Sequence, residues 1–226
     1  MFKLRIISLL FLLIPSPLFA QRPAVVRMEA HERASSSLGT GTCLATTGSQ
    51  SLIISAWHVI RDANGGITVK FPNVNEIYFV NKDIVSNKDW DVALLVIPKG
   101  NMPTIRLANS IPDVGMPLII AGYGSGMYRE TTGLVKHFYS PVGNYPTDIV
   151  AIDVAARPGD SGGGMFYLDG TLAGVLFGSD SLGAHGTHCM RVRWFIQTSL
   201  NKYPDLQQEA LRIPEDYLLY GFDNDE

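Results

Sequence analysis

The stretch RPGDSGGGMF, residues 157–166, places one serine, Ser161, among glycines and directly before an apolar run. Glycine permits positive φ angles and lets the backbone approach a neighbouring group closely, so this stretch predicts a tight turn that leads into a strand. Consecutive backbone N–H groups in such a turn can converge on one anion. A merely flexible glycine-rich loop is the alternative, but the specific order Gly-Asp-Ser-Gly-Gly and the flanking apolar runs favour a functional turn.

Short apolar runs surround this turn from residue 39 onward, and Gly, Pro, Asn and Asp separate them. The runs are rich in Val, Ile, Leu, Phe and Tyr, with no amphipathic helix between them, which is typical of a β-sandwich or β-barrel. We predict strands in residues 51–55, 67–71, 76–80, 92–97, 117–123, 149–154, 164–167 and 172–177. Two short helical segments are expected near the end, over residues 194–200 and 207–212.

The two ends of the chain differ from this central part. Residues 1–20 combine a basic start, an apolar run from Ile6 to Ile14 and a small residue, Ala20, which is the pattern of a secretory signal peptide. A buried N-terminal helix is the alternative. We interpret residues 21–37 as an extended N-terminal arm and residues 201–226 as a C-terminal extension. No other stretch is apolar and long enough to span a membrane. Because residues 1–20 have the signal-peptide pattern, the chain is predicted to be exported, to the periplasm or the medium.

Composition restricts the function further. The 226 residues are 46% hydrophobic and 17% charged, which predicts a compact core and excludes a disordered chain. The net charge of −3 argues against nucleic acid as a partner. The sequence contains no Cys-x-x-Cys, His-Glu-x-x-His or phosphate loop, so we predict neither metal nor cofactor. Cys43 and Cys189 could form a disulfide in an exported chain, or remain two buried free thiols.

A serine hydroxyl is a poor nucleophile and needs an adjacent base, which histidine can supply when a carboxylate orients it. His58 directly follows the run 51–55, and Asp91 opens the run 92–97. Alone, each has an ordinary explanation, a structural histidine and an aspartate in a turn. Together with Ser161 they supply the three groups of such a site: a nucleophile, a base and an orienting carboxylate. Asp89 is the rival carboxylate, but its place before the apolar run favours a solvated turn residue.

In the order His58, Asp91, Ser161, the chain resembles the trypsin-like serine proteases of the chymotrypsin fold, and in particular their secreted bacterial members. The resemblance covers about residues 38–200. It rests on GTGT at 39–42, AWHV at 56–59, DVALL at 91–95 and GDSGG at 159–163. It implies two six-stranded antiparallel β-barrels, over about 38–105 and 113–195, with the site in the cleft between them.

The resemblance also implies a serine endopeptidase that acts on protein or peptide substrates through an acyl-enzyme. Ser161 would attack the peptide carbonyl, His58 would take its proton, and Asp91 would orient His58. The backbone N–H groups of Gly159 and Ser161 would form the oxyanion hole.

The resemblance places the substrate pocket at Ala155, Phe177, Gly178 and Ser179. Because residue 155 is not acidic, an uncharged side chain of small to medium size is the expected substrate. His185 and His188 could instead recognise an acidic group, or be ordinary structural histidines.

The chain departs from the family pattern at several positions: Trp57 and Gly164 replace the usual Ala and Pro, and two further departures concern a disulfide and the N-terminus. Val59 follows His58 where animal digestive members have a cysteine, so Cys43 has no disulfide partner there. No Ile-Val-Gly-Gly start is present, so we expect local backbone hydrogen bonds at Asp160 instead of a newly cut N-terminus. Two other functions remain open. A catalytically silent binding protein does not need a complete triad, and an esterase of the usual fold has a different triad order.

Overall fold

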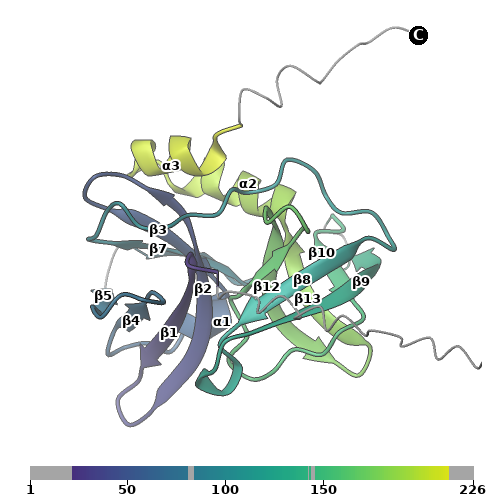
Figure 1. Cartoon of the computed structure of the whole chain (residues 1–226), viewed down its shortest axis with the longest axis horizontal. Helices are drawn as coiled ribbons and strands as arrows, with labels where there is room; N and C mark the ends of the chain where they lie inside the picture. Colours follow the sequence, from purple (N-terminus) through teal and green to yellow (C-terminus); the bar gives the residue numbers. More distant parts are fainter. Residues whose placement is uncertain (1–21, 81–83, 142, 144–145, 214–226) are drawn as a thin grey trace, which may run out of the picture.

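The chain folds into two β units that lie side by side, with helices at one end (Figure 1). The structure is a computed structural model that describes residues 22–80, 84–141, 143 and 146–213. Paired strands within both units run antiparallel to one another. The predicted all-β class with a short helical C-terminal segment is confirmed.

The N-terminal unit is an open sheet of seven strands, in the order β5-β4-β1-β2-β3-β7-β6. In this unit the structure has a sheet that does not close through hydrogen bonds, where the sequence predicted a closed six-stranded barrel. Both edge strands are short, with three residues in β5 and four in β6, and they stand at opposite ends of the hydrogen-bonded order, although β5 also lies near β7. The strands are β1 Val25–His31, β2 Ser36–Thr46, β3 Ser51–Ser55, β4 Ile67–Lys70, β5 Tyr78–Val80, β6 Ile84–Asn87 and β7 Val92–Ile97.

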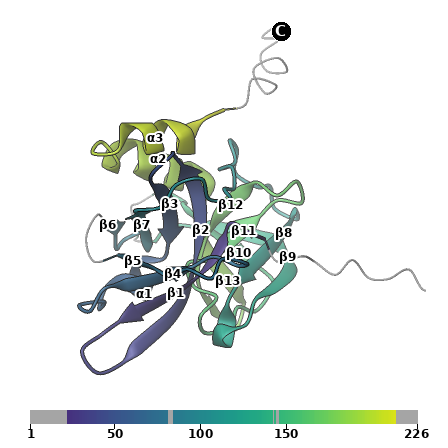
Figure 2. The ribbon, with the colours of Figure 1, turned by 60° about the vertical axis from the view of Figure 1, so that its left-hand side comes forward.

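Strand β1 corrects the predicted N-terminal arm. It pairs with β2 on one side and β4 on the other, and Val26, Met28 and Ala30 are buried in the core of the sheet. Arg27 and Glu29 alternate with them and are only partly buried. This period of two is the pattern of a strand with one buried face, so the N-terminal unit begins at Val25 and not near residue 38. Figure 2 shows the β1–β2 hairpin projecting from the sheet.

The C-terminal unit is a closed six-stranded barrel in the order β10-β13-β12-β11-β8-β9, as predicted. Apolar side chains such as Leu118, Val135 and Met165 fill its interior. Closure leaves no free edge, which makes this unit a rigid support for the turns between its strands. The strands are β8 Pro117–Gly122, β9 Arg129–Tyr139, β10 Ile149–Ile152, β11 Gly164–Phe166, β12 Leu172–Asp180 and β13 Gly183–His188.

Helices α2 Cys189–Ser199 and α3 Pro204–Leu211 pack on a third apolar cluster that both β units share. Phe195 of α2 and Leu206 of α3 are buried in this cluster, so the predicted C-terminal extension is part of the folded body up to the end of α3. Two shorter elements, α1 Trp57–Ile60 and the 3₁₀ turn η1 Gly124–Gly126, lie in the loops. No helix within the described ranges has the length and apolar character of a membrane span.

Cys43 and Cys189 are free thiols, and both are buried. Cys43 belongs to the core of the N-terminal sheet, whereas Cys189 begins α2 in the shared cluster. Burial raises the pKa of each thiol to about 12, because a thiolate would lose its hydration there. Of the two alternatives that the sequence left open, the structure therefore contains the pair of buried thiols.

Candidate active site

His58 lies on α1, the single helical turn that follows β3. All five residues of β3 are buried, so the strand holds the start of this turn firmly against the sheet. The His58 side chain is 33% exposed, at the border between the N-terminal unit and solvent. The end of β3 therefore places the His58 imidazole at the surface, partly exposed to solvent.

Asp91 lies in the turn between β6 and β7 and contacts His58 twice. Its Oδ2 lies 2.6 Å from the His58 Nδ1, and its Oδ1 accepts the backbone N–H of His58 at 2.7 Å. Asp91 has a φ of +49°, a left-handed conformation that aspartate tolerates better than most residues. One carboxylate thus fixes both the ring and the backbone of the histidine. If the Nδ1 donates to Asp91, the Nε2 is left as the basic nitrogen.

Asp89, the rival carboxylate, is placed differently. Its backbone N–H donates to the Asn87 Oδ1 at 2.9 Å, and so does that of Trp90 at 3.2 Å. This arrangement is an Asx turn that starts the hairpin. The structure therefore brings Asp91, and not Asp89, to His58, as the sequence predicts.

Ser161 lies in the turn between β10 and β11, with glycines of positive φ on both sides: +94° at Gly159 and +84° at Gly162. Its hydroxyl donates to the carbonyl of Phe177 on β12 at 3.2 Å. Ser161, Gly159 and His58 line one hollow of about 450 Å³, together with Leu38 and Pro158 among others. The predicted nucleophile and base thus meet in one place although they belong to different β units.

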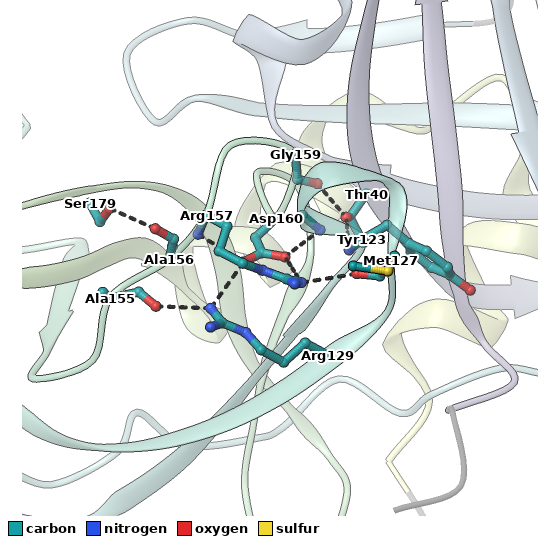
Figure 3. A network of polar contacts seen from close by, with 11 residues as sticks. Thr40, Tyr123, Met127, Arg129, Ala155, Ala156, Arg157, Gly159, Asp160 and Ser179 are labelled. Atoms are coloured by element: carbon teal, nitrogen blue, oxygen red, sulfur yellow. Dashed lines mark hydrogen bonds and ion pairs between the residues drawn. The ribbon is translucent and has the colours of Figure 1, made fainter.

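The backbone N–H groups of Gly159 and Ser161 are available in this turn. Within the described part of the chain, neither donates to another protein group. The carbonyls of these residues are held instead by Thr40 of β2. Its hydroxyl donates to the Gly159 oxygen at 2.7 Å (Figure 3). Its N–H donates to the Ser161 oxygen at 2.8 Å. Two free N–H groups beside a serine can stabilise a negative oxygen.

Of the four residues predicted to bind substrate, Phe177, Gly178 and Ser179 lie on β12, and Ala155 precedes the nucleophile turn in the chain. Phe177 accepts the Ser161 hydroxyl, and Ser179 donates to the carbonyl of Ala156 at 3.3 Å, one residue after Ala155. A side chain at Gly178 would meet no atom within 4 Å, so the strand is open there. None of these residues is charged. A second cavity, of about 400 Å³, lies between residues 106–110 and 167–171, away from all of them.

His185 and His188 both have acidic partners within the chain. The Nε2 of His185 lies 3.1 Å from the Asp180 carboxylate. His188 is buried 3.5 Å from Asp148 and accepts the backbone N–H of Arg191 at the start of α2. Burial lowers the pKa of His188. These contacts match structural histidines, the other alternative that the sequence left open.

Three polar residues of this region were not singled out by sequence reasoning. Thr40 lies 119 positions from Gly159 in the chain, and no local pattern announces their contact. Arg157 and Arg129 both reach Asp160, at 2.9 and 3.5 Å. Only Arg157 carried a signal, because it stands at the head of the glycine-rich stretch. Among the described residues, no group of three or more His, Cys, Asp or Glu side chains could hold a metal ion.

Comparison with known proteins identifies the family of the chain. The family model described as trypsin-like peptidase domain matches residues 39–175. The chain belongs to this family. The resemblance to trypsin-like serine proteases that the motifs indicate is thereby confirmed.

Relatives in the family include two proteins described as probable periplasmic serine endoproteases, DegP-like. The protein from Pseudomonas fulva is 32% identical over 159 residues, covering 69% of this chain and 32% of the relative. The protein from Marinomonas is 30% identical over 161 residues, covering 70% of this chain and 33% of the relative. The chain thus spans about one third of the length of these relatives.

Solved structures share the fold of this trypsin-like domain. The HtrA-type protease AlgW with tripeptide superposes with a TM-score of 0.68 at 22% identity, covering 80% of this chain and 62% of that protein. The active form of the Rv3671c protease from M. tuberculosis superposes with a TM-score of 0.64 at 19% identity, covering 78% and 81%. At these identities the likeness concerns the fold alone.

Proposed function

We propose that the chain is an exported serine endopeptidase that hydrolyses peptide bonds through His58, Asp91 and Ser161. The observation that carries the proposal is the contact of 2.6 Å between the Asp91 carboxylate and the His58 Nδ1, on the rim of the hollow that Ser161 lines. This contact leaves the Nε2 of His58 as the base that a serine nucleophile requires. Family membership supports the same chemistry.

In the first step, the Ser161 hydroxyl rotates from the Phe177 carbonyl towards His58 as substrate enters. The His58 Nε2 takes the hydroxyl proton while the oxygen forms a bond to the substrate carbonyl carbon. The carbonyl oxygen becomes an oxyanion, which the N–H groups of Gly159 and Ser161 stabilise. One such donor is worth about 3 kcal/mol in a transition state.

In the second step, the tetrahedral intermediate collapses and the carbon–nitrogen bond breaks. His58 gives its proton to the leaving amine, and an acyl group remains on Ser161. A water molecule then attacks the acyl carbon, His58 again takes a proton, and the free serine returns with the release of the acid. Throughout, Asp91 stabilises the imidazolium that forms twice in this cycle.

For the substrate, we propose an uncharged side chain of small to medium size in a pocket formed by Ala155, Phe177, Gly178 and Ser179. The absence of a charged group among these four residues supports this preference. For location, we propose export directed by residues 1–20, which lie outside the described residues. The periplasmic description of the relatives supports an exported protein.

The test is labelling of residues 21–226 with a serine-directed fluorophosphonate, beside the variants Ser161→Ala and His58→Ala. We expect labelling at Ser161 that both substitutions abolish, and a loss of peptide turnover of about 10⁶-fold for either variant. A folded wild-type chain that takes no label would refute the proposal and favour a catalytically silent binding protein. Comparison of matched peptide and ester substrates separates an endopeptidase from an esterase.

A further inference from the structure

The carboxylate of Asp160 has no part in the proposed chemistry, yet the residue is only 2% exposed and lies between Gly159 and Ser161. An ionised carboxylate that is buried without partners is costly, so groups must hold it. Because Asp160 joins the two proposed oxyanion donors, any group that holds its side chain also holds the backbone on both sides of it.

The main partner of Asp160 is Arg157, three residues earlier. The Arg157 Nη2 and Nε donate to the two carboxylate oxygens at 2.9 and 3.1 Å, and its backbone N–H adds a third bond at 2.8 Å (Figure 3). Gly124 donates to the same carboxylate at 2.6 Å, and the guanidinium of Arg129 lies 3.5 Å away. Bidentate pairs of this kind combine strength with a fixed geometry. The carboxylate is thus neutralised entirely by groups within the chain.

Arg157 also reaches the turn over residues 123–127. Its Nη2 donates to the Met127 carbonyl at 3.0 Å. At the tip of this turn, Ser125 has a left-handed φ of +55°, and its N–H donates to the Pro158 carbonyl at 2.9 Å. Arg157 therefore links the 123–127 turn to the nucleophile loop. The same turn also holds the Pro158 carbonyl, which precedes Gly159, through the Ser125 N–H.

The hydrogen bond from Ser125 to the Pro158 carbonyl sets the direction of the Gly159 N–H. The Pro158 carbonyl and the Gly159 N–H belong to one planar trans peptide, so they point in opposite directions. With the Pro158 oxygen held by Ser125, the N–H faces away from the turn. Glycine itself offers little resistance to a flip of this peptide, because it populates positive and negative φ about equally. The orientation consequently depends on the surrounding contacts.

Two glycines of the neighbouring strand and turn leave room for these contacts. A Cβ added at Gly122 would lie 2.8 Å from the Asp160 Oδ1, and one at Gly124 would lie 2.5 Å from the Arg157 Nε. Both are closer than real Cβ contacts come. The sequence Ala-Gly-Tyr-Gly at 121–124 is thereby explained by close packing against the Arg157–Asp160 pair.

We infer that Arg157 is a positioning residue, which holds Asp160 and the 123–127 turn so that the peptide between Pro158 and Gly159 presents its N–H to the oxyanion. This inference rests on the proposed function for its effect on turnover, and on the contacts above for its effect on the loop. Because two guanidinium groups already neutralise Asp160, the loop needs no newly cut N-terminus to hold it.

The test compares Arg157→Ala, Arg157→Lys and the control Arg212→Ala, which removes an exposed arginine at the end of α3. For Arg157→Ala we expect kcat on a peptide substrate to fall about 100-fold, as for the loss of one oxyanion donor, with KM little changed. Added guanidinium ion should restore part of the lost kcat in a saturable manner, and only in this variant. Arg157→Lys should keep intermediate activity, since lysine retains the charge without the fork.

A folded Arg157→Ala chain with wild-type kcat would overturn the inference, and so would a loss that appears only in KM. If Arg157→Ala does not fold, Asp160→Asn replaces it, because the amide keeps one acceptor oxygen while the charge is lost. The same fall in kcat is expected there, and wild-type kcat would again contradict the assigned role.

Amide hydrogen exchange provides a readout that does not depend on turnover. Without the Arg157 side chain, the N–H groups of Gly124 and Ser125 should exchange faster, because their acceptors Asp160 and Pro158 are no longer held. The N–H of Gly170, which bonds to the Tyr167 carbonyl at 3.0 Å, is the internal control. Unchanged exchange at Gly124 and Ser125 would refute the inference even if the wild type cleaved no peptide. A wild type that is inactive, with accelerated exchange in the variant, would instead refute only the proposed function.

Discussion

The two β units differ in the hydrogen bonds of the candidate site residues that each one contributes. In the N-terminal sheet, Asp91 already holds the His58 ring at 2.6 Å and its backbone at 2.7 Å. In the C-terminal barrel, the Ser161 hydroxyl donates to Phe177 of the same barrel at 3.2 Å. The hydrogen bonds of His58 and of the Ser161 hydroxyl thus each stay within one unit, and the proposed mechanism requires the hydroxyl to turn from Phe177 towards His58.

The difference follows from how each pair is connected. His58 and Asp91 stand at the ends of β3 and β7, which are direct neighbours in one sheet with Ser55 opposite Ala93. Ser161 belongs to the other unit, and its carbonyl accepts the Thr40 N–H of the N-terminal sheet at 2.8 Å. The following predictions test each side of this comparison.

Among the substitutions that compare the two units, the largest effect is expected for Asp91→Asn in the N-terminal unit. An amide can hold the ring in place but favours the wrong tautomer and cannot stabilise the imidazolium, so kcat should fall about 10⁴-fold. Stability should change little, because asparagine also tolerates a left-handed φ. Steady-state kinetics on a peptide substrate measure the effect. Asp89→Asn is the control and should retain wild-type kcat; equal losses in both variants would argue against Asp91 as the partner of His58.

Gly162→Ala tests how closely the two units approach. A Cβ there would lie 2.1 Å from the Thr40 carbonyl oxygen and 2.2 Å from the Ser55 Oγ, at a φ of +84°. Gly115→Ala is matched, because Gly115 has a φ of +87° but no atom within 4 Å of an added Cβ. Urea denaturation should show a loss of about 1–2 kcal/mol for Gly115→Ala from the backbone conformation alone. For Gly162→Ala we expect a further loss of about 1–3 kcal/mol from overpacking. Equal losses would show that the border is not tightly packed.

Thr40→Val tests the polar link between the units at nearly constant shape. The Thr40 hydroxyl donates to the Gly159 carbonyl and accepts the Tyr123 N–H at 2.9 Å. Its removal leaves both groups without this partner, so the free energy of unfolding should fall by about 1–3 kcal/mol. Thr42, two residues on and equally buried, is the control, because among the described residues its hydroxyl has no hydrogen-bond partner. Thr42→Val should therefore be neutral or stabilising. A loss at Thr42 as large as that at Thr40 would show that the Thr40 hydrogen bonds do not link the units.

The smallest effect at neutral pH concerns the buried thiols, one in the N-terminal core and one in the shared cluster. Each pKa rises from 9.0 to about 12 on folding. Between these values the unfolded chain releases protons that the folded chain keeps, so stability should fall as the pH rises above about 9. Cys43→Ala and Cys189→Ala should each reduce this fall, as measured by urea denaturation at several pH values. Iodoacetamide should modify neither thiol in the folded protein at pH 7. Rapid modification there would show that the cores open.

Local sequence predicted the candidate site residues of this protein and most of its strands. A serine among glycines, a histidine after one apolar run and an aspartate before another are signals that span only a few residues. The strand pattern did not predict the strands that lack a run of apolar residues. Strand β1 mixes charged with apolar residues, β9 contains Arg129, Glu130 and Lys136, and β13 consists largely of glycine and histidine.

Tertiary structure alone decided how these parts meet. The N-terminal sheet stays open, which no short stretch predicts. Residues distant in the chain also meet: Thr40 contacts Gly159, and Arg129 lies beside Asp160. The glycines at 122 and 124 acquire a reason only when the Arg157–Asp160 pair is seen to pack against them. Residue types and short spacings specify which groups are present, because they act through local backbone geometry. Which groups touch across the border of two β units depends on how both units fold and pack, and no short stretch of sequence contains that information.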